Sequence, residues 1–229
     1  MLAAVIFDFD GIIVDTEPFH HKAFMEVLKP YGIACSWADY LEHYAGFDDR
    51  DAFRAFFSNA GKRLSKTKLL HLLAEKAETF AAVVAGGVTP YPGVLGLIRT
   101  LAYDLPLGLC SGAVRSDILP ILTQIGLDNI FRVMVTADDV PVSKPDPACY
   151  RLALQQLGCL APDLCSQGKG CLAIEDTPTG IAAARGAGLP VLAITNNYPA
   201  ERLQGEGCTV RSSLVGIGVA ELQAILLGK

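Results

Sequence analysis

Short apolar runs recur along the chain and alternate with segments that have helical periodicity. The runs cover residues 3–8, 105–110, 132–136, 171–176 and 190–195. Strands that are apolar throughout are buried on both faces, and strands separated by helices are typical of parallel sheets. The pattern therefore predicts an α/β fold, a Rossmann-like parallel sheet with helices on both faces. Pro120 weakens the helix expected over residues 114–125, because a proline inside a helix removes a hydrogen bond, unless that helix starts later along the chain.

Residues 16–88 depart from this alternation, because their sequence carries helical patterns and no apolar strand. Four helical stretches follow one another, PFHHKAFMEVLK, WADYLEHYA, DDRDAFRAFFSNA and SKTKLLHLLAEKAETFAAVVA, and the Gly- and Pro-rich GGVTPYPG ends the region. We interpret residues 16–88 as an all-helical insertion after the first strand. Residues 1–15 and 89–229 would then form the α/β core.

Composition excludes several classes of protein. The chain has 229 residues, of which 51% are hydrophobic, and a net charge of -5 with no basic block. Nucleic acid is therefore not expected as a partner. No apolar run reaches the roughly 18 residues of a membrane helix, so a membrane is not expected either. The N-terminus lacks the pattern of a signal peptide, and we expect a cytoplasmic protein.

Cysteine and histidine usage narrows the chemistry further. The seven cysteines are odd in number and form no C-x-x-C pair, so we expect reduced thiols that pack as small hydrophobic side chains. All four histidines lie in the first third of the chain, the last of them at His71. A Ser-His-Asp triad within the remaining two thirds is therefore excluded.

Polar residues stand where the predicted strands end. In an open parallel sheet the functional site forms at the carboxyl ends of the strands. The residues at these ends, or in the loop that follows a strand, are Asp8, Asp10, Ser111, Gly112, Lys144, Glu175 and Asp176. Each has an ordinary explanation alone, as a turn, a helix start or a solvated loop residue. Their occurrence in order at the ends of one sheet favours a single site.

The residue types at these strand ends indicate a cation and a phosphate. Four carboxylates at one edge repel each other and raise one another's pKa. Mg²⁺ resolves this conflict because it prefers oxygen ligands. Ser111 and the amide of Gly112 are expected to open a helix, where an anion is favoured. Lys144 adds a compact positive charge.

The motifs FDFDG, CSG, SKPDP and IEDTPTGIAAARGAG, in this order, resemble the four signature motifs of the haloacid dehalogenase superfamily. The helical segment after the first motif is similar to the first class (C1) of cap domain in that superfamily. The resemblance covers essentially the whole chain. Its nearest branch contains phosphoglycolate phosphatases, sugar-phosphate phosphatases and β-phosphoglucomutase.

The resemblance implies a role for each core residue. Asp8 would be the nucleophile that forms an aspartyl-phosphate, and Asp10 would be the general acid and base. Mg²⁺ would be held by Asp8, the carbonyl of Asp10 and Asp176, with Glu175 in direct or indirect contact. The residues expected to bind the phosphoryl oxygens are Ser111, Gly112 and Lys144. The implied activity is a Mg²⁺-dependent phosphatase of small phosphorylated metabolites.

Asp10 decides between two reactions within the superfamily. The members that displace halide resemble this sequence at the nucleophile but lack the second aspartate, because a halide leaving group needs no acid. The presence of Asp10 therefore favours phosphoryl transfer over dehalogenation.

Substrate choice is expected to lie in the helical insertion. Thr16 and Glu17 stand at the first hinge, and His20 and Lys76 match positions where relatives of this branch often have histidine and lysine. His20 could equally be a packing residue and Lys76 a solvated one. We expect Thr16, His20, Arg50 and Lys76 to contact the substrate. A phosphomutase of β-phosphoglucomutase type would need a basic residue for a second phosphate shortly after the glycine of GFDDRDAF. Arg50 is displaced by one residue from that position, or about 100° around a helix.

Three functions remain open. A phosphatase is favoured, a β-phosphoglucomutase-like phosphomutase is the alternative, and a non-catalytic phosphometabolite-binding protein is a remote third possibility. The segment 163–170 lengthens the connection into the fourth strand, and we expect a surface loop there.

Overall fold

A computed structural model describes residues 1–45, 47–160, 170–205 and 207–228. Within these residues, parallel strands form one six-stranded sheet with the order β3-β2-β1-β4-β5-β6. The strands are β1 (Ala4–Phe7), β2 (Leu107–Cys110), β3 (Val133–Val135), β4 (Cys171–Glu175), β5 (Val191–Ile194) and β6 (Cys208–Arg211). The first strand of the chain therefore lies in the middle of the sheet, between β2 and β4.

The predicted α/β fold is confirmed, and all five predicted strands are present with shorter ends. The sixth strand, β6, was not predicted. Its residues are half-buried or exposed, because β6 is an edge strand that pairs only with β5. The sequence of β6, CTVR, has no continuous apolar run, so it resembles that of a loop.

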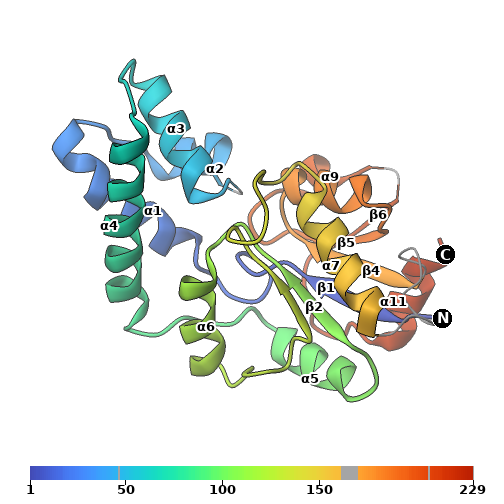
Figure 1. Ribbon diagram of the computed structural model, residues 1–229. Helices are drawn as coiled ribbons and strands as arrows, with labels where there is room; N and C mark the ends of the chain where they lie inside the picture. The colour runs from blue at the N-terminus through green and yellow to red at the C-terminus, as the bar shows by residue number, and fades with distance from the viewer. Residues whose placement is uncertain (46, 161–169, 206, 229) are drawn as a thin grey trace.

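Helices cover both faces of the sheet (Figure 1). Alternate residues of β1 enter two different hydrophobic cores, Val5 and Phe7 on one face and Ala4 and Ile6 on the other. The first core includes α5 (Val94–Asp104), α6 (Arg115–Gln124) and α11 (Val219–Leu226). The second includes α7 (Ala148–Leu160), α9 (Pro178–Gly186) and the short α10 (Ala200–Leu203). Burial on both faces explains why the strands are apolar throughout.

The segment between β1 and α5 forms a separate group of helices, here called the helical unit. It contains α1 (Glu17–Leu28), the 3₁₀ turn η1 (Lys29–Tyr31), α2 (Trp37–His43), α3 (Asp49–Asn59) and α4 (Lys66–Val84). The unit has its own core, in which the aromatic rings of Phe24, Phe53 and Phe56 pack together. It lies beyond the end of the sheet at which β1 ends, in the upper left of Figure 1.

Two adjacent chain segments connect the helical unit to the α/β core. Val14 pairs with Pro90 in an isolated β-bridge, and the amide of Tyr91 donates to the carbonyl of Ile13 at 3.0 Å. The outgoing and returning chains therefore run side by side. The division at residues 16 and 88 remains a prediction.

Helix α6 contains Pro120 and continues through it to Gln124, so the doubt about this helix was wrong. The missing N–H of Pro120 leaves the carbonyl of Ser116 without its helical partner. Both residues are exposed, so water can hydrogen-bond to that carbonyl.

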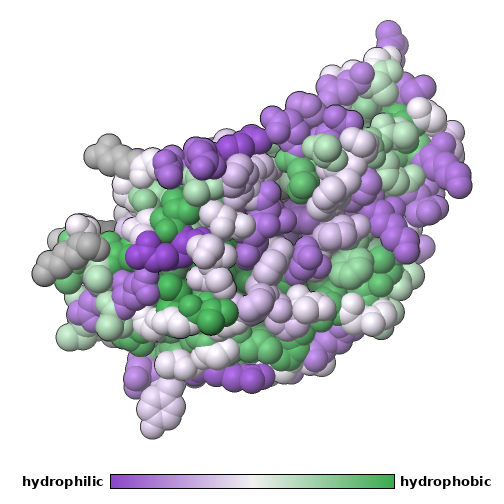
Figure 2. Space-filling view, turned by 180° about the vertical axis from the view of Figure 1, so that it is seen from behind, coloured by the Kyte–Doolittle hydropathy of each residue, from purple (hydrophilic) through white to green (hydrophobic). Residues whose placement is uncertain are grey.

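The surface seen from behind carries hydrophilic residues along its upper margin, and apolar side chains show between polar ones below (Figure 2). Among the described residues, no helix combines the length and apolar character needed to cross a membrane. The segment 163–170, expected to be a surface loop, lies outside the described residues except for Gly170.

Candidate active site

The carboxyl ends of β1, β2 and β4 bring the predicted site residues together. Asp8 follows β1 directly, and its amide donates to the carbonyl of Ile174 at 2.9 Å. Ser111 follows β2, and Glu175 and Asp176 close β4. Because β1 lies between β2 and β4, Asp8 takes the central position. Asp8, Ser111, Glu175 and Asp176 are all buried.

Lys144 joins two of the carboxylates. Its Nζ atom lies 2.6 Å from Oδ1 of Asp8 and 2.6 Å from Oε1 of Glu175. The same atom donates to the carbonyl of Cys110 at 3.3 Å. Burial alone would lower the pKa of the Lys144 amine, but the two carboxylates hold it well above its ordinary value. Lys144 is therefore a permanent cation.

Glu175 is held on both of its carboxylate oxygens. Tyr150 donates its hydroxyl to Oε1 at 2.8 Å, and the amides of Asp176 and Thr177 donate to Oε2 at 3.1 and 3.4 Å. A Cβ atom at Gly180 would lie 2.0 Å from Oε1. The first turn of α9 therefore needs glycine at this position. The hydrogen bond from Tyr150 to Glu175 was not predicted, because nothing in the sequence around Tyr150 indicates a functional residue.

Asp176 carries an unpartnered buried oxygen. Its Oδ2 accepts a hydrogen bond from Nδ2 of Asn197 at 2.7 Å. Its Oδ1, in contrast, is buried with no hydrogen-bond partner among the described residues. An unpaired buried oxygen of this kind is costly. Asn197 was also missed, although it follows the predicted strand β5 and the strand-end rule could have found it.

The carboxylates of Asp8, Glu175 and Asp176 offer oxygen atoms within 4.8 Å of one another. Burial first, and the neighbouring negative charges next, raise the pKa of Asp176 well above its ordinary value. The pKa of Asp8 is also raised well above its ordinary value by burial, although Lys144 opposes this shift. An oxygen-preferring divalent cation would relieve both the repulsion and the unpaired oxygen. The residues present therefore fit Mg²⁺.

Asp10 lies beside the cluster and faces the helical unit. Its Oδ1 accepts a hydrogen bond from the Thr16 hydroxyl and lies 3.4 Å from Nε2 of His20. Its Oδ2 accepts from the Ser111 hydroxyl at 3.3 Å. Burial alone would raise the pKa of Asp10, but His20, Thr16 and the charge of Lys76 together bring it below its ordinary value. The resting Asp10 is a carboxylate.

Ser111 and Gly112 do not open a helix, so that expectation was wrong. Helix α6 begins three residues later, at Arg115. The Ser111 hydroxyl instead accepts a hydrogen bond from the amide of Ala113 at 2.9 Å. Residues 111–114 form a turn that brings Gly112 and Ala113 to the cavity wall.

His20 and Lys76 belong to one buried network of the helical unit. Lys76 is fully buried, and its Nζ atom lies 2.8 Å from Nδ1 of His20 and 2.8 Å from Oδ2 of Asp49. Asp117 of α6 lies 3.8 Å away. The His20 ring stacks on Phe80, with centroids 4.2 Å apart. Lys76 reaches the site through His20 and is not among the described residues that line the cavity.

Arg50 does not face the site. Its guanidinium lies 2.6 Å from Oδ2 of Asp48 and donates to the carbonyls of Ala137 and Val140 at 3.2 and 3.3 Å. It is not among the described lining residues. The expectation that Arg50 contacts the substrate is therefore not supported, because its side chain is used to hold α3 against the loop after β3. Thr16 is likewise buried, donates its hydroxyl to Asp10 and is not among the described lining residues.

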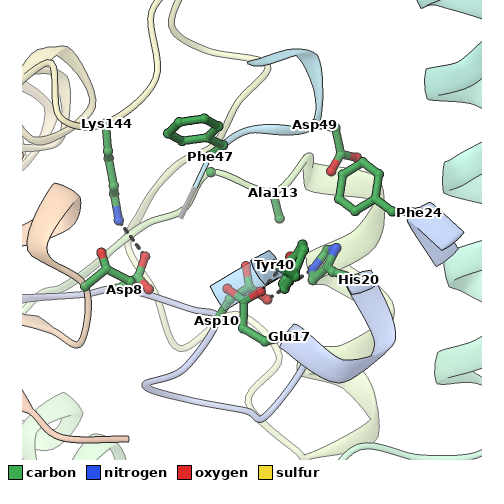
Figure 3. A pocket seen from close by; sticks show the side chains of 12 residues that line it. Asp8, Asp10, Glu17, His20, Phe24, Tyr40, Phe47, Asp49, Ala113 and Lys144 are labelled. Atoms are coloured by element: carbon green, nitrogen blue, oxygen red, sulfur yellow. Dashed lines mark hydrogen bonds and ion pairs between the residues drawn. The ribbon is translucent and has the colours of Figure 1, made fainter. Parts of the chain in front are cut away.

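A cavity separates the sheet edge from the helical unit (Figure 3). Lys144 and Asp8 lie together on one side of the view, and Asp10, Glu17, His20 and Tyr40 gather on the other. The described residues that line it are Asp8, Asp10, Glu17, His20, Phe24, Tyr40, Phe47, Asp49, Gly112, Ala113, Lys144 and Thr177. Its volume of about 40 Å³ holds only a few water molecules. The helical unit therefore closes tightly over the carboxylates.

Glu17 and Tyr40 were missed as lining residues. The Tyr40 hydroxyl donates to Oε2 of Glu17 at 2.7 Å, and both residues are buried. Burial raises the pKa of Glu17 from its ordinary value. Glu17 was expected only at a hinge, and Tyr40 comes from α2, whose placement depends on the fold of the helical unit.

The fold and the site define a class of protein, an α/β enzyme with a helical insertion after β1 and a carboxylate–lysine cluster at the sheet edge. The sequence profile of the haloacid dehalogenase-like hydrolases matches residues 5–194. The chain belongs to this family, as the sequence motifs predicted.

Named relatives support the assignment. The chain is 32% identical over 204 residues to Protein CbbY of Rhodobacter capsulatus, covering 86% of this chain and 87% of that protein. It is 31% identical over 189 residues to fructose-1-phosphate phosphatase YqaB of Escherichia coli, covering 82% and 93%. The crystal structure of a CbbY mutant from Rhodobacter sphaeroides in complex with xylulose-(1,5)bisphosphate superposes with a TM-score of 0.84 at 25% identity, covering 97% and 99%.

Proposed function

We propose that this protein is a Mg²⁺-dependent phosphatase that hydrolyses small phosphorylated metabolites through a phosphorylated Asp8. The observation that carries the proposal is the arrangement at the sheet edge. Asp8 lies 2.6 Å from Lys144, beside an Asp176 oxygen that has no partner among the residues described by the structure. Asp10 lines the same cavity. Family membership and phosphatase relatives agree with it.

In the first step an oxygen of Asp8 attacks phosphorus, and the bond between phosphorus and the ester oxygen breaks. Asp10 donates a proton to the departing alkoxide. The resting Asp10 is ionised, so it must gain this proton as substrate binds. The negative charge of the incoming phosphate raises the pKa of the nearby carboxyl and favours that uptake.

In the second step water attacks the phosphorus of the Asp8 acyl phosphate. Asp10, now a carboxylate, takes a proton from this water, and inorganic phosphate leaves as Asp8 is restored. Lys144, the Ser111 hydroxyl and the Gly112 amide are assigned to the phosphoryl oxygens. Mg²⁺, held by the side chains of Asp8 and Asp176 and the carbonyl of Asp10, with Glu175 in direct or indirect contact, would neutralise charge on the transferred group.

The helical unit is proposed to act as a cap. Phe80 and Val84 of α4 pack into the apolar core beside α5 and α6. Elsewhere the helical unit meets the α/β core through hydrogen bonds, such as the Tyr198 hydroxyl donating to the carbonyl of Leu41 at 2.7 Å and the Ser143 hydroxyl donating to Asp51 at 2.5 Å. Such contacts can break and re-form, and a cavity of about 40 Å³ requires an opening movement before a metabolite enters. The phosphomutase alternative gains no support, because Arg50 does not face the site.

The test is phosphate release from p-nitrophenyl phosphate and a panel of phosphorylated metabolites. We expect turnover with Mg²⁺, loss with EDTA and recovery when Mg²⁺ is restored. Asp8→Asn should lower kcat by at least about 10³-fold. Asp104→Asn, an exposed substitution at the end of α5, is the matched control and should leave the rate unchanged. Turnover by Asp8→Asn at the wild-type rate would refute the mechanism.

A further inference from the structure

The wall that the helical unit contributes to the cavity is built from acceptors and aromatic rings. Its polar members are Glu17, His20, Tyr40 and Asp49, and its rings are Phe24 and Phe47. Asp49 stands above His20 on the side away from Asp8 (Figure 3). Carboxylates accept hydrogen bonds and donate none when ionised. This wall therefore suits a group that offers hydroxyl donors.

The cationic side chains near this wall already have partners within the protein. Lys76 is fully buried and lies 2.8 Å from Asp49, 3.8 Å from Asp117 and 2.8 Å from the His20 ring. The Arg50 guanidinium is held by Asp48 and two carbonyls outside the cavity. Among the described residues that line the cavity, Lys144 alone carries a permanent positive charge, and it lies beside Asp8 at the sheet edge.

A second anionic group on the substrate would therefore find no uncompensated cation among the described residues of this wall. With its phosphate bound between Asp8 and Lys144, the rest of the substrate extends toward Glu17 and Asp49. Burying a charge that has no partner is costly, and no described lysine or arginine is free there to pair with a second anionic group. A hydroxyl in the same place can donate to either carboxylate, and the rings of Phe24 and Phe47 can contact its carbon chain.

From this wall we propose that the substrate is the monophosphate of a neutral polyhydroxy compound, a sugar or sugar alcohol, and that Asp49 is the specificity-determining residue that excludes a second phosphate or a carboxylate. This proposal rests on the proposed phosphatase function. A solved relative was crystallised with a sugar bisphosphate. The proposal therefore predicts that this chain discriminates against a class of substrate that a relative binds.

The first measurement is kcat/KM of the wild type for fructose 1-phosphate, fructose 1,6-bisphosphate and 2-phosphoglycolate, with p-nitrophenyl phosphate as a generic ester. We expect the sugar monophosphate to exceed both the bisphosphate and phosphoglycolate by at least about tenfold. Equal or better use of either doubly anionic substrate would overturn the substrate class while the generic ester is still hydrolysed. Failure to hydrolyse any of the four esters would instead overturn the proposed function.

The second measurement assigns the discrimination to Asp49. In Asp49→Asn Lys76 loses the carboxylate that compensates it, and its charge becomes available to a second anionic group. The monophosphate-to-bisphosphate ratio should therefore fall by about tenfold, mainly through KM for the bisphosphate. Asp39→Asn is the control, because it makes the same change at an exposed position of α2 outside the cavity lining, and it should keep the wild-type ratio. An unchanged ratio in folded Asp49→Asn would overturn the role of Asp49. The wild-type ratios test the substrate class even if this variant does not fold.

Discussion

The Nζ atom of Lys144 lies 2.6 Å from Oδ1 of Asp8, although 136 positions separate the two residues in the chain. The same ammonium lies 2.6 Å from Oε1 of Glu175. One buried cation thus compensates two buried carboxylates. This relationship makes Lys144 a structural as well as a functional residue.

Replacement of Lys144 should therefore cost both activity and stability. In Lys144→Met two buried carboxylates lose their cation, and removal of one partner from a buried ion pair typically costs about 3–5 kcal/mol. Urea unfolding measures the loss, and phosphate release measures activity. Lys62→Met, an exposed lysine of the helical unit, should change neither by a measurable amount. A Lys144→Met protein as stable as the wild type would contradict the buried-pair geometry.

Mg²⁺ should stabilise the folded protein more strongly as the pH rises. Burial and neighbouring charges raise the pKa of Asp176 well above its ordinary value, so the metal-free folded protein holds a proton that the unfolded chain loses. That contribution to stability is full below the ordinary aspartate pKa of about 4 and is lost as pH rises through the raised folded pKa. Mg²⁺ needs the deprotonated carboxylate.

Thermal unfolding with Mg²⁺ and with EDTA, measured from acidic to mildly alkaline pH, tests this expectation. The difference in Tm should widen as pH rises. Asp176→Asn should abolish the widening, because the amide neither titrates nor attracts the cation. A Tm difference that is constant across the range would show that Mg²⁺ does not compete with protons at this cluster.

Asp117 should make stability fall between about pH 4 and pH 6. Burial raises the pKa of Asp117 to about 6, against the opposing charge of Lys76. The neutral form is favoured in the folded state, so its contribution is full below the ordinary pKa and is lost as pH rises through about 6.

Comparison of the wild type with Asp117→Asn isolates the contribution of Asp117 to the pH dependence of stability. The free energy of unfolding of the wild type should fall relative to that of the variant by about 1–3 kcal/mol from pH 4 to pH 7. Asp128→Asn, an exposed change just after α6, should follow the wild type. Parallel pH profiles for the wild type and Asp117→Asn would refute the raised pKa.

Gly180 should not tolerate a methyl group. In Gly180→Ala the new Cβ would lie 2.0 Å from Oε1 of Glu175, so Glu175 must move away from Lys144 and Tyr150. We expect a loss of about 2 kcal/mol or more in stability, with reduced activity. Gly96→Ala in α5 has nothing within 4 Å of the new atom and should stabilise by about 0.5–1 kcal/mol. Similar effects of the two substitutions would contradict the close packing at Gly180.

Much of the site could be predicted because the residues that follow the strands of a parallel sheet all come to the same edge of that sheet. Asp8, Ser111, Glu175 and Asp176 follow strands whose apolar runs were visible, and strand ends meet at one edge. The same rule extended to β5 would have found Asn197. Tyr150 could not be found in this way, because it stands inside α7 and reaches Glu175 only through the packing of that helix against the sheet.

The helices of the helical unit could be predicted from the sequence, but the side chains that the unit turns toward the cavity could not. The caps Ser36, Asp48 and Ser65 and the apolar spacing mark α2, α3 and α4 closely. The directions of their side chains depend on how the helices pack. Arg50 was expected at the substrate and is turned to the carbonyls of Ala137 and Val140, whereas Asp49 beside it faces the cavity.

By itself the sequence determined the α/β core, the helical insertion and the carboxylate set at the sheet edge, because burial on both faces leaves an unmistakable run of apolar residues and the strands must end in polar ones. The tertiary structure alone decided which charges meet. Lys144 compensates Asp8 and Glu175, one oxygen of Asp176 has no partner in the part of the chain that the structure describes, and Lys76 is neutralised by Asp49. Such pairings depend on distances of a few ångströms between residues far apart in the chain, and Coulomb energy at that range is set by packing and burial rather than by local sequence.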